Sequence, residues 1–173
     1  GRVARVFQDP LAGTCEGLTI EENLALAIKR GQRRGLSAAV KARYMDQFKS
    51  SLASLNLDLE NRLGDKMGLL SGGQRQAVSL LMASLTPSAI LLLDEHTAAL
   101  DPKTASFVLD LTTQIIKEQK LTALMVTHSM KQALEVGDRT VMLHPGWKWT
   151  TTVCCWADHA RRQTRLRGTL HAP

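Results

Sequence analysis

Leu70-Ser71-Gly72-Gly73-Gln74 stands directly before a segment whose apolar residues recur at helical spacing, namely Ala77, Val78, Leu81 and Leu85. The two glycines leave their backbone N–H groups open to close approach by a ligand. A helix that begins here also points the positive end of its dipole at that ligand. The stretch therefore predicts an anion site, suited to a phosphate group, at the start of a helix.

A second stretch, Ala89 to Leu93, is apolar without alternation and ends in Asp94-Glu95. Its length and composition predict a buried parallel strand. Ligands of open α/β sheets collect at the carboxyl ends of strands, where these two carboxylates lie. Nucleotide hydrolysis needs one carboxylate to hold Mg²⁺ and another to orient the attacking water or accept its proton. The pair is placed for both roles.

These motifs resemble the ATP-binding subunit of an ABC transporter, whose signature loop reads LSGGQ and whose Walker B strand ends in Asp-Glu. Three further segments, in the family's order, resemble the Q-loop (Phe7 to Pro10), the D-loop (Ala98 to Asp101) and the switch-histidine strand end (Val126 to His128). Each motif is weak alone, and their order carries the resemblance, which covers residues 2 to 146. It implies an α/β fold: a partial P-loop NTPase-like ABC ATPase core with a helical subdomain.

The resemblance implies ATP and Mg²⁺ as cofactors and a role for each matched residue. Gln8 senses Mg²⁺ and the γ-phosphate and faces the membrane subunit, and Asp94 serves the metal through its water shell. Ser71, Gly72, Gly73 and Gln74 bind the γ-phosphate of ATP held by the opposite subunit. Glu95 is the catalytic base, Asp101 crosses the dimer, and His128 contacts the γ-phosphate. His96 is assigned no chemistry.

The same resemblance implies partners. A complete ATP site requires a homodimer or a paired ATPase subunit facing head to tail, and the pair drives membrane permease subunits from the cytoplasmic face of the plasma membrane. A solute-binding protein is expected as well, and nucleic acid is not. Residues 9–13 and 94–97 look most like the ATPases of bacterial importers for amino acids or related small solutes.

A phosphate-binding loop of the form Gly-x-x-x-x-Gly-Lys-Ser/Thr does not occur in residues 1–173. Such a loop cradles the β- and γ-phosphates with its amides and lysine, and in the family it precedes the Q-loop by several dozen residues. The sequence therefore predicts a chain that lacks the Walker A region at its N-terminus and is inactive alone.

Periodicity and capping residues predict the remaining elements. Thr19 and Glu22 form a capping box that opens a helix through Ile28. Ser37 caps a longer helical segment containing Val40, Tyr44, Phe48, Leu52 and Leu55. Asp101 caps a helix with Pro102 at its first position. Strands are predicted at 3–7, 90–94, 121–127 and 139–143, and a helix at 130–136. The expected domains are 1–146, with a helical subdomain at about 10–86 joined at a flexible stretch, Asp9 to Gly13.

His128 directly follows one of these predicted strands, as Glu95 follows another. Its imidazole is therefore expected at the same strand-end rim as the Glu95 carboxylate.

Composition changes after Gly146. All three tryptophans and two of the three cysteines fall within ten residues, 147–156. Residues 147–173 are therefore predicted to be an atypical basic tail, frame-shifted or disordered. Five of the 22 Lys and Arg and one of the 16 Asp and Glu lie in this tail, which leaves 17 and 15, or +2 of the formal +6, for residues 1–146. A basic cluster at 29–34 is expected to be a solvated helix end; its alternative is a face toward a membrane subunit or lipid.

Two alternatives to a transport ATPase stay open. A DNA-maintenance ATPase shares the Ser-Gly-Gly signature and the Asp-Glu pair, although such relatives commonly carry Glu at the position of Gln74 and many have coiled coils or zinc-binding cysteines. The other alternative is a nonfunctional fragment. No apolar run in the sequence is long enough to span a bilayer, and three cysteines without metal-ligand spacing fit a reducing compartment.

Overall fold

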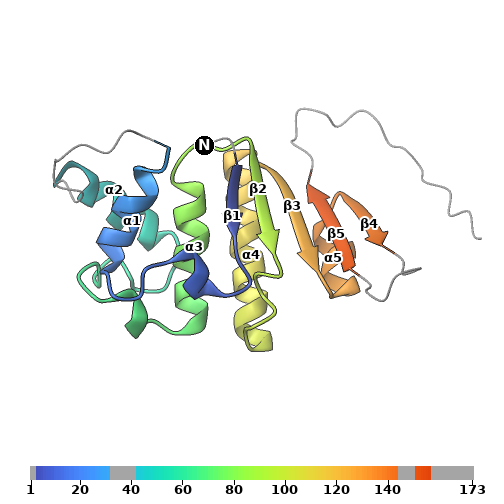
Figure 1. Ribbon diagram of the computed structural model, residues 1–173, viewed down its shortest axis with the longest axis horizontal. Helices are drawn as coiled ribbons and strands as arrows, with labels where there is room; N and C mark the ends of the chain where they lie inside the picture. The colour runs from blue at the N-terminus through green and yellow to red at the C-terminus, as the bar shows by residue number, and fades with distance from the viewer. Residues whose placement is uncertain (1–2, 32–41, 144–150, 157–173) are drawn as a thin grey trace, which may run out of the picture.

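A mixed sheet with three parallel strands organises the protein (Figure 1). The computed structural model describes residues 3–31, 42–143 and 151–156. The strands of this described part are β1 (Val3–Val6), β2 (Ile90–Asp94), β3 (Thr122–Thr127), β4 (Arg139–Leu143) and β5 (Thr151–Trp156). Their order is β1-β2-β3-β5-β4, with β1, β2 and β3 parallel and β5 antiparallel to both of its neighbours. The predicted α/β class is confirmed.

Helices occupy the connections between the strands. They are α1 (Ile20–Ile28), α2 (Ala42–Ala53), α3 (Gly72–Ser84), α4 (Pro102–Gln119) and α5 (Met130–Val136), with two short 3-10 helices, η1 (Pro10–Gly13) and η2 (Met67–Leu69). The caps predicted at Thr19 and Asp101 are confirmed, because each side chain accepts a hydrogen bond from the backbone three residues on. The predicted cap at Ser37, and Val40 after it, lie outside the described residues.

The stretch expected to be a flexible joint, Asp9 to Gly13, contains a capped helical turn, and its flexibility stays a prediction. The Asp9 carboxylate accepts from the Leu11 amide at 2.9 Å, and Pro10 occupies the first position of η1. Both features favour a single backbone conformation at this point. The helical part therefore leaves the sheet through a structured connection.

Helix α3 ties the helical part to the sheet. It packs against α1 and α2 on one side and against β1 and α4 on the other. The buried side chains of both parts, from Phe48 of α2 to Leu91 of β2, form one hydrophobic cluster. The division of residues 1–146 at about 10–86 stays a prediction, since no break in this core marks it.

Strands β1, β2 and β3 are buried on one face only. Along β2 the odd positions Leu91 and Leu93 are 0% and 1% exposed, whereas Ile90 is 39% exposed, and β1 and β3 alternate in the same way. The prediction of a buried parallel strand is therefore confirmed for the pairing of β2 and for one of its faces. An apolar run in the sequence does not indicate whether helices cover one face or both faces of the strand.

Strand β5 was not predicted. Residues 151–156 pair with β3 and β4, so this part of the tail is a strand rather than a disordered segment. Its β-branched residues favour a strand, but the unusual composition of the residues around them led to the prediction of an atypical tail. The frame-shift hypothesis stays a prediction, and the rest of the tail lies outside the described residues. Within the described part, no helix has the length and hydrophobicity to cross a membrane.

Candidate functional site

The carboxyl ends of β1, β2 and β3 meet at one edge of the sheet, where their arrowheads point in the same direction in Figure 1. Gln8 follows β1, Glu95 follows β2 and His128 follows β3. Because β2 and β3 are parallel neighbours, the prediction that Glu95 and His128 share a rim is confirmed. None of the hydrogen bonds among the described residues joins the exposed Gln8 to Asp94 or Glu95.

Glu95 and His128 form the centre of this rim. The Glu95 carboxylate is 16% exposed and its Oε1 lies 2.5 Å from Nε2 of His128, whose side chain is 62% exposed. Glu95 has a φ of 44°, an uncommon value for a residue other than glycine. Its amide donates to the Val126 carbonyl at 3.0 Å, and its carbonyl accepts from the Ala98 amide at 2.9 Å. These two bonds hold the strained residue in place.

A pocket of about 330 Å³ opens beside this pair. It is lined by Glu95, Thr97, Ala98, Thr127, His128, Ser129 and Gln132. The turn that carries His128 is held by hydrogen bonds: the Thr127 hydroxyl donates to Gln132 Oε1 at 3.0 Å and accepts from the Ser129 amide at 3.1 Å. A carboxylate that can take a proton and an imidazole that orients it therefore face a space that can hold water and a phosphate.

Asp94 has a partner that was not predicted from the sequence. Its Oδ2 lies 2.5 Å from Arg5 of β1, and both side chains are about half exposed. The Arg5 guanidinium also lies 4.6 Å from the centre of the Phe7 ring. No local signal joins positions 5 and 94, because their contact arises only when β1 pairs with β2. A cation at Asp94 must share this carboxylate with the guanidinium.

The side chains at the rim fit a Mg²⁺ ion that takes most of its ligands from phosphates and waters rather than from the protein. Among the described residues, no three metal-ligating side chains gather, so an all-protein cage is absent from them. Mg²⁺ in nucleotide sites is held by one or two carboxylates together with phosphates and waters. Asp94 supplies one such carboxylate, whereas the neighbouring Glu95 carboxylate is paired with His128. Gln8 is not drawn into this set in the structure.

The signature residues begin α3 with a reciprocal cap. The Ser71 hydroxyl accepts from the Gln74 amide at 3.2 Å, and Gln74 Oε1 accepts from the Ser71 amide at 3.1 Å. This cap was not predicted, although Ser-x-x-Gln is the usual signal for it. Because these two side chains satisfy each other's backbone, the groups left for an anion are the amides of Gly72 and Gly73.

The signature helix lies beside the D-loop of the same chain. A Cβ atom added at Gly72 would lie 3.5 Å from Leu100 Cδ2. Asp101 caps α4 by accepting from the Thr104 amide at 3.0 Å, and this hydrogen bond is the largest cause that holds the pKa of the Asp101 carboxyl below its usual value. Within the described part of the chain, no hydrogen bond or ion pair joins residues 71–74 to Glu95 or His128. The predicted separation of the two motifs is thus compatible with the geometry.

Two contacts of α3 were also not predicted. Arg75 donates to the carbonyls of Met67, Gly68 and Leu70, at 3.3, 3.1 and 3.1 Å. Gln76 is fully buried, and its Nε2 donates to the Phe7 carbonyl at 3.2 Å. The first contact holds the turn before the signature, and the second connects α3 to the backbone just before Gln8.

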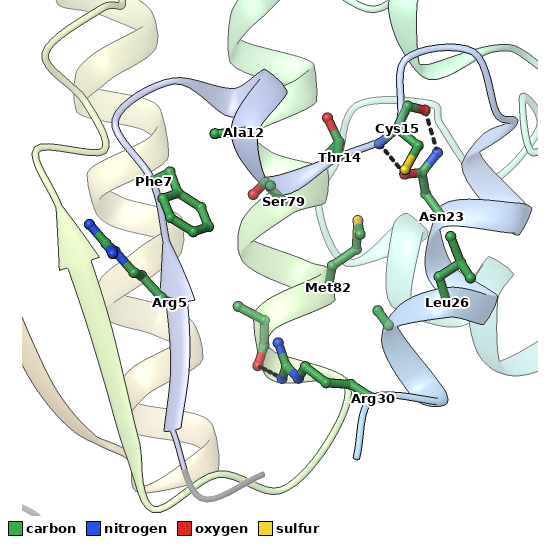
Figure 2. A pocket seen from close by; sticks show the side chains of 13 residues that line it. Arg5, Phe7, Ala12, Thr14, Cys15, Asn23, Leu26, Arg30, Ser79 and Met82 are labelled. Atoms are coloured by element: carbon green, nitrogen blue, oxygen red, sulfur yellow. Dashed lines mark hydrogen bonds between the residues drawn. The ribbon is translucent and has the colours of Figure 1, made fainter. Parts of the chain in front are cut away.

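Figure 2 shows a second pocket, of about 360 Å³, which is lined in part by Phe7. The Phe7 ring, Leu26 of α1 and Met82 of α3 give it apolar walls, and Arg5 and Arg30 stand at its margins. Arg30 donates to the Ala83 carbonyl at 3.2 Å and to the Thr86 hydroxyl at 3.0 Å. The expectation of a solvated cluster is therefore wrong for Arg30, whereas Arg33 and Arg34 lie outside the described residues.

His96 is a core residue. Its side chain is 1% exposed, and Nε2 lies 3.0 Å from the Thr112 hydroxyl. That hydroxyl donates to the Val108 carbonyl at 2.7 Å, so Nε2 carries the proton. Burial lowers the pKa of His96 from 6.5 to about 4. No chemistry was assigned to it from the sequence, and the structure gives it a packing role.

This burial predicts a pH dependence of stability. The unfolded chain binds a proton at His96 below pH 6.5, whereas the folded chain binds it only near pH 4. Stability is therefore lost as the pH falls through this window, by about 3 kcal/mol from this group. Urea unfolding at several pH values checks the prediction. His96→Gln keeps a hydrogen-bond donor for Thr112 but has no group that titrates in this range. Its free energy of unfolding should therefore fall less on acidification than that of the wild type. Equal losses in the two proteins would contradict the prediction.

Comparisons with known proteins agree with these motifs. The ABC transporter family matches residues 1–98. A tyrosine transport ATP-binding protein of Clostridioides difficile (strain R20291) is 49% identical over 144 residues, covering 83% of this chain and 57% of that protein. The thiamine import ATP-binding protein ThiQ of Escherichia coli (strain K12) is 34% identical, covering 75% of this chain and 52% of that protein. The chain thus spans about half the length of the curated relatives it matches.

Solved structures give the same result. The dimeric post-hydrolysis state of an ATP-binding cassette bound to ADP and Pi matches 76% of this chain and 54% of its own, with a TM-score of 0.59 and 29% identity. CbiO1 of Clostridium perfringens, part of the cbiONQ complex, shares the fold with a TM-score of 0.56 and 22% identity over 74% of this chain and 47% of its own. With the family matched over residues 1–98 of 173, this chain belongs to the ABC transporter family and to its ATP-binding proteins.

Proposed function

We propose that this chain is part of an ATP-hydrolysing subunit that drives solute transport across a membrane through nucleotide-dependent pairing of two subunits. The observation that carries the proposal is the Glu95–His128 pair, held at 2.5 Å at the carboxyl edge of β2 and β3. The subunit would bind peripherally at the cytoplasmic face of the plasma membrane, against permease subunits.

In this proposal Glu95 removes the proton from the water that attacks the γ-phosphate. The carboxylate is mostly shielded from solvent and its orientation is set by His128, which is what a general base requires. His128 also lines the pocket and can donate a hydrogen bond to a phosphate oxygen. Mg²⁺, when bound, would neutralise phosphate charge, and Asp94 would hold it. Gln8 would sense the metal from the end of β1.

The second half of each site would come from the paired subunit. The Gly72 and Gly73 amides start α3 beside the D-loop, and among the described residues no hydrogen bond or ion pair links them to Glu95. An anion at the start of α3 is stabilised by the amides and the helix dipole. We therefore assign Ser71 to Gln74, with Asp101, to the ATP of the partner, in a homodimer or with a homologous subunit.

The pocket in Figure 2 supports a permease contact. It lies among the residue before Gln8, helix η1 and helices α1 and α3. An apolar groove with arginines at its margins suits an amphipathic helix that presents one apolar face. A movement of that helix would reach α3 through Gln76, which binds the Phe7 carbonyl.

The proposed solute is an amino acid or a related small molecule, delivered by a solute-binding protein. The tyrosine transport relative supports this choice over thiamine by its higher identity. The test is uptake of labelled tyrosine by liposomes containing the subunit with an upstream phosphate loop, its permease subunits and its binding protein. We expect uptake that requires ATP and Mg²⁺. ATP turnover without uptake of any amino acid would overturn the solute class, and a salt-dependent affinity for DNA would favour the DNA-maintenance alternative.

The 173-residue chain alone is expected to be inactive. Its sequence contains no Gly-x-x-x-x-Gly-Lys-Ser/Thr stretch, and its described residues supply no lysine to the pocket beside Glu95 and His128. Measurable ATP hydrolysis by this chain would contradict that expectation.

A further inference from the structure

Helices α3 and α4 approach each other closely at Gly73. A Cβ atom added to Gly73 would lie 2.1 Å from Cγ2 of Thr104, whereas ordinary contacts begin at 3.4 Å. The other Thr104 side-chain atoms are farther away, with Cβ at 3.6 Å and Oγ1 at 3.8 Å. One methyl group therefore accounts for the whole conflict.

The same residue also holds the D-loop. The Thr104 amide donates to Oδ2 of Asp101 at 3.0 Å, which caps α4. Its methyl group faces Gly73, which is buried in the first turn of α3. Thr104 thus touches Asp101 through its backbone and Gly73 through its side chain. Figure 1 shows the starts of α3 and α4 at the same end of the molecule.

We propose that Thr104 is a positioning residue that sets the spacing between the signature amides at the start of α3 and Asp101 at the start of α4. This inference rests on the proposed function for its consequence, since both groups would face the partner's ATP. A fixed spacing matters because closely packed elements do not absorb an added atom without moving. An alanine in place of Gly73 brings its Cβ to 2.1 Å from the methyl carbon, so either the signature amides or the Thr104 side chain must shift to restore ordinary contact at 3.4 Å.

A double-mutant cycle tests the spacing in the full chain. Gly73→Ala should lower the unfolding midpoint by roughly 5 °C. Adding Thr104→Ser removes the methyl group and keeps the hydroxyl, so it should restore most of that loss. Adding Thr104→Val keeps a methyl group and should not. Gly17→Ala is the matched control, because a Cβ there meets nothing within 4 Å.

The consequence for ATP is measured in a subunit that carries an upstream phosphate loop and is assembled with its permease subunits. Gly73→Ala should reduce kcat/KM for ATP by about 100-fold, chiefly through a higher KM. Combining Gly73→Ala with Thr104→Ser should recover this activity, and combining it with Thr104→Val should not. A merely structural effect would lower the yield of folded protein without changing KM.

The outcomes separate the two proposals. Additive effects of the two substitutions, equal rescue by Thr104→Ser and Thr104→Val, or failure of the Gly73→Ala, Thr104→Ser double variant to fold would each overturn the role of Thr104. Absence of ATP turnover in a wild-type assembly that carries the phosphate loop would overturn the proposed function, and the unfolding cycle would still decide whether Thr104 sets the spacing.

Discussion

Glu95→Gln is expected to abolish ATP turnover while ATP-dependent pairing of subunits persists, in a subunit that carries an upstream phosphate loop. The amide keeps the size of the carboxylate and a hydrogen-bonding oxygen for His128, so the local geometry should survive. It cannot accept the proton of the attacking water. Loss of a general base lowers turnover by about 10² to 10⁴-fold, and bound ATP then remains uncleaved between the subunits.

The measurements are phosphate release and size-exclusion chromatography with ATP. Glu135→Gln is a matched control, because that carboxylate is exposed on α5 and lies 4.0 Å from Lys131. The control should hydrolyse ATP at the wild-type rate. Wild-type turnover by Glu95→Gln would show that another residue is the base.

Gly73→Asp is expected to eliminate both ATP-dependent pairing and turnover. The new side chain meets Thr104 at its first atom, and it adds a negative charge next to the amides that are proposed to bind the γ-phosphate. Steric displacement and charge repulsion therefore act in the same direction. Pairing measured by light scattering with ATP should fall to the level seen without nucleotide.

Two variants separate these causes. Gly73→Asn introduces the same bulk without the charge and should retain more pairing at high ATP concentration than Gly73→Asp. Gly64→Asp, at a position where a Cβ meets nothing within 4 Å, should behave as the wild type. Unaltered ATPase activity in Gly73→Asp would contradict the assignment of the signature to a phosphate.

Features of the fold that depend on neighbouring residues could be predicted from the sequence. The helix caps at Thr19 and Asp101 are local patterns, and the structure has both. The meeting of Glu95 and His128 was also predictable, because each follows a strand and parallel strands end at one edge. Here periodicity and capping carry enough information, since the contacts are set by backbone geometry.

Features that depend on tertiary pairing could not be predicted in this way. The Arg5–Asp94 pair joins residues 89 positions apart, and the approach of Gly73 to Thr104 arises from helix packing. Glycine at 73 was interpreted only as an opening for phosphate, although its burial also requires the absence of a side chain. The one-sided burial of β2 likewise depends on which faces the helices cover.

The central claim is that Glu95 and the signature of one chain act on different ATP molecules. Mixing Glu95→Gln subunits with Gly73→Asp subunits tests it most directly, because a mixed dimer holds one site with both defects and one site with none. We expect that the mixture, assembled with permease and carrying an upstream phosphate loop, recovers about a quarter of wild-type ATP turnover for random pairing. Turnover no higher than that of either variant alone would contradict it.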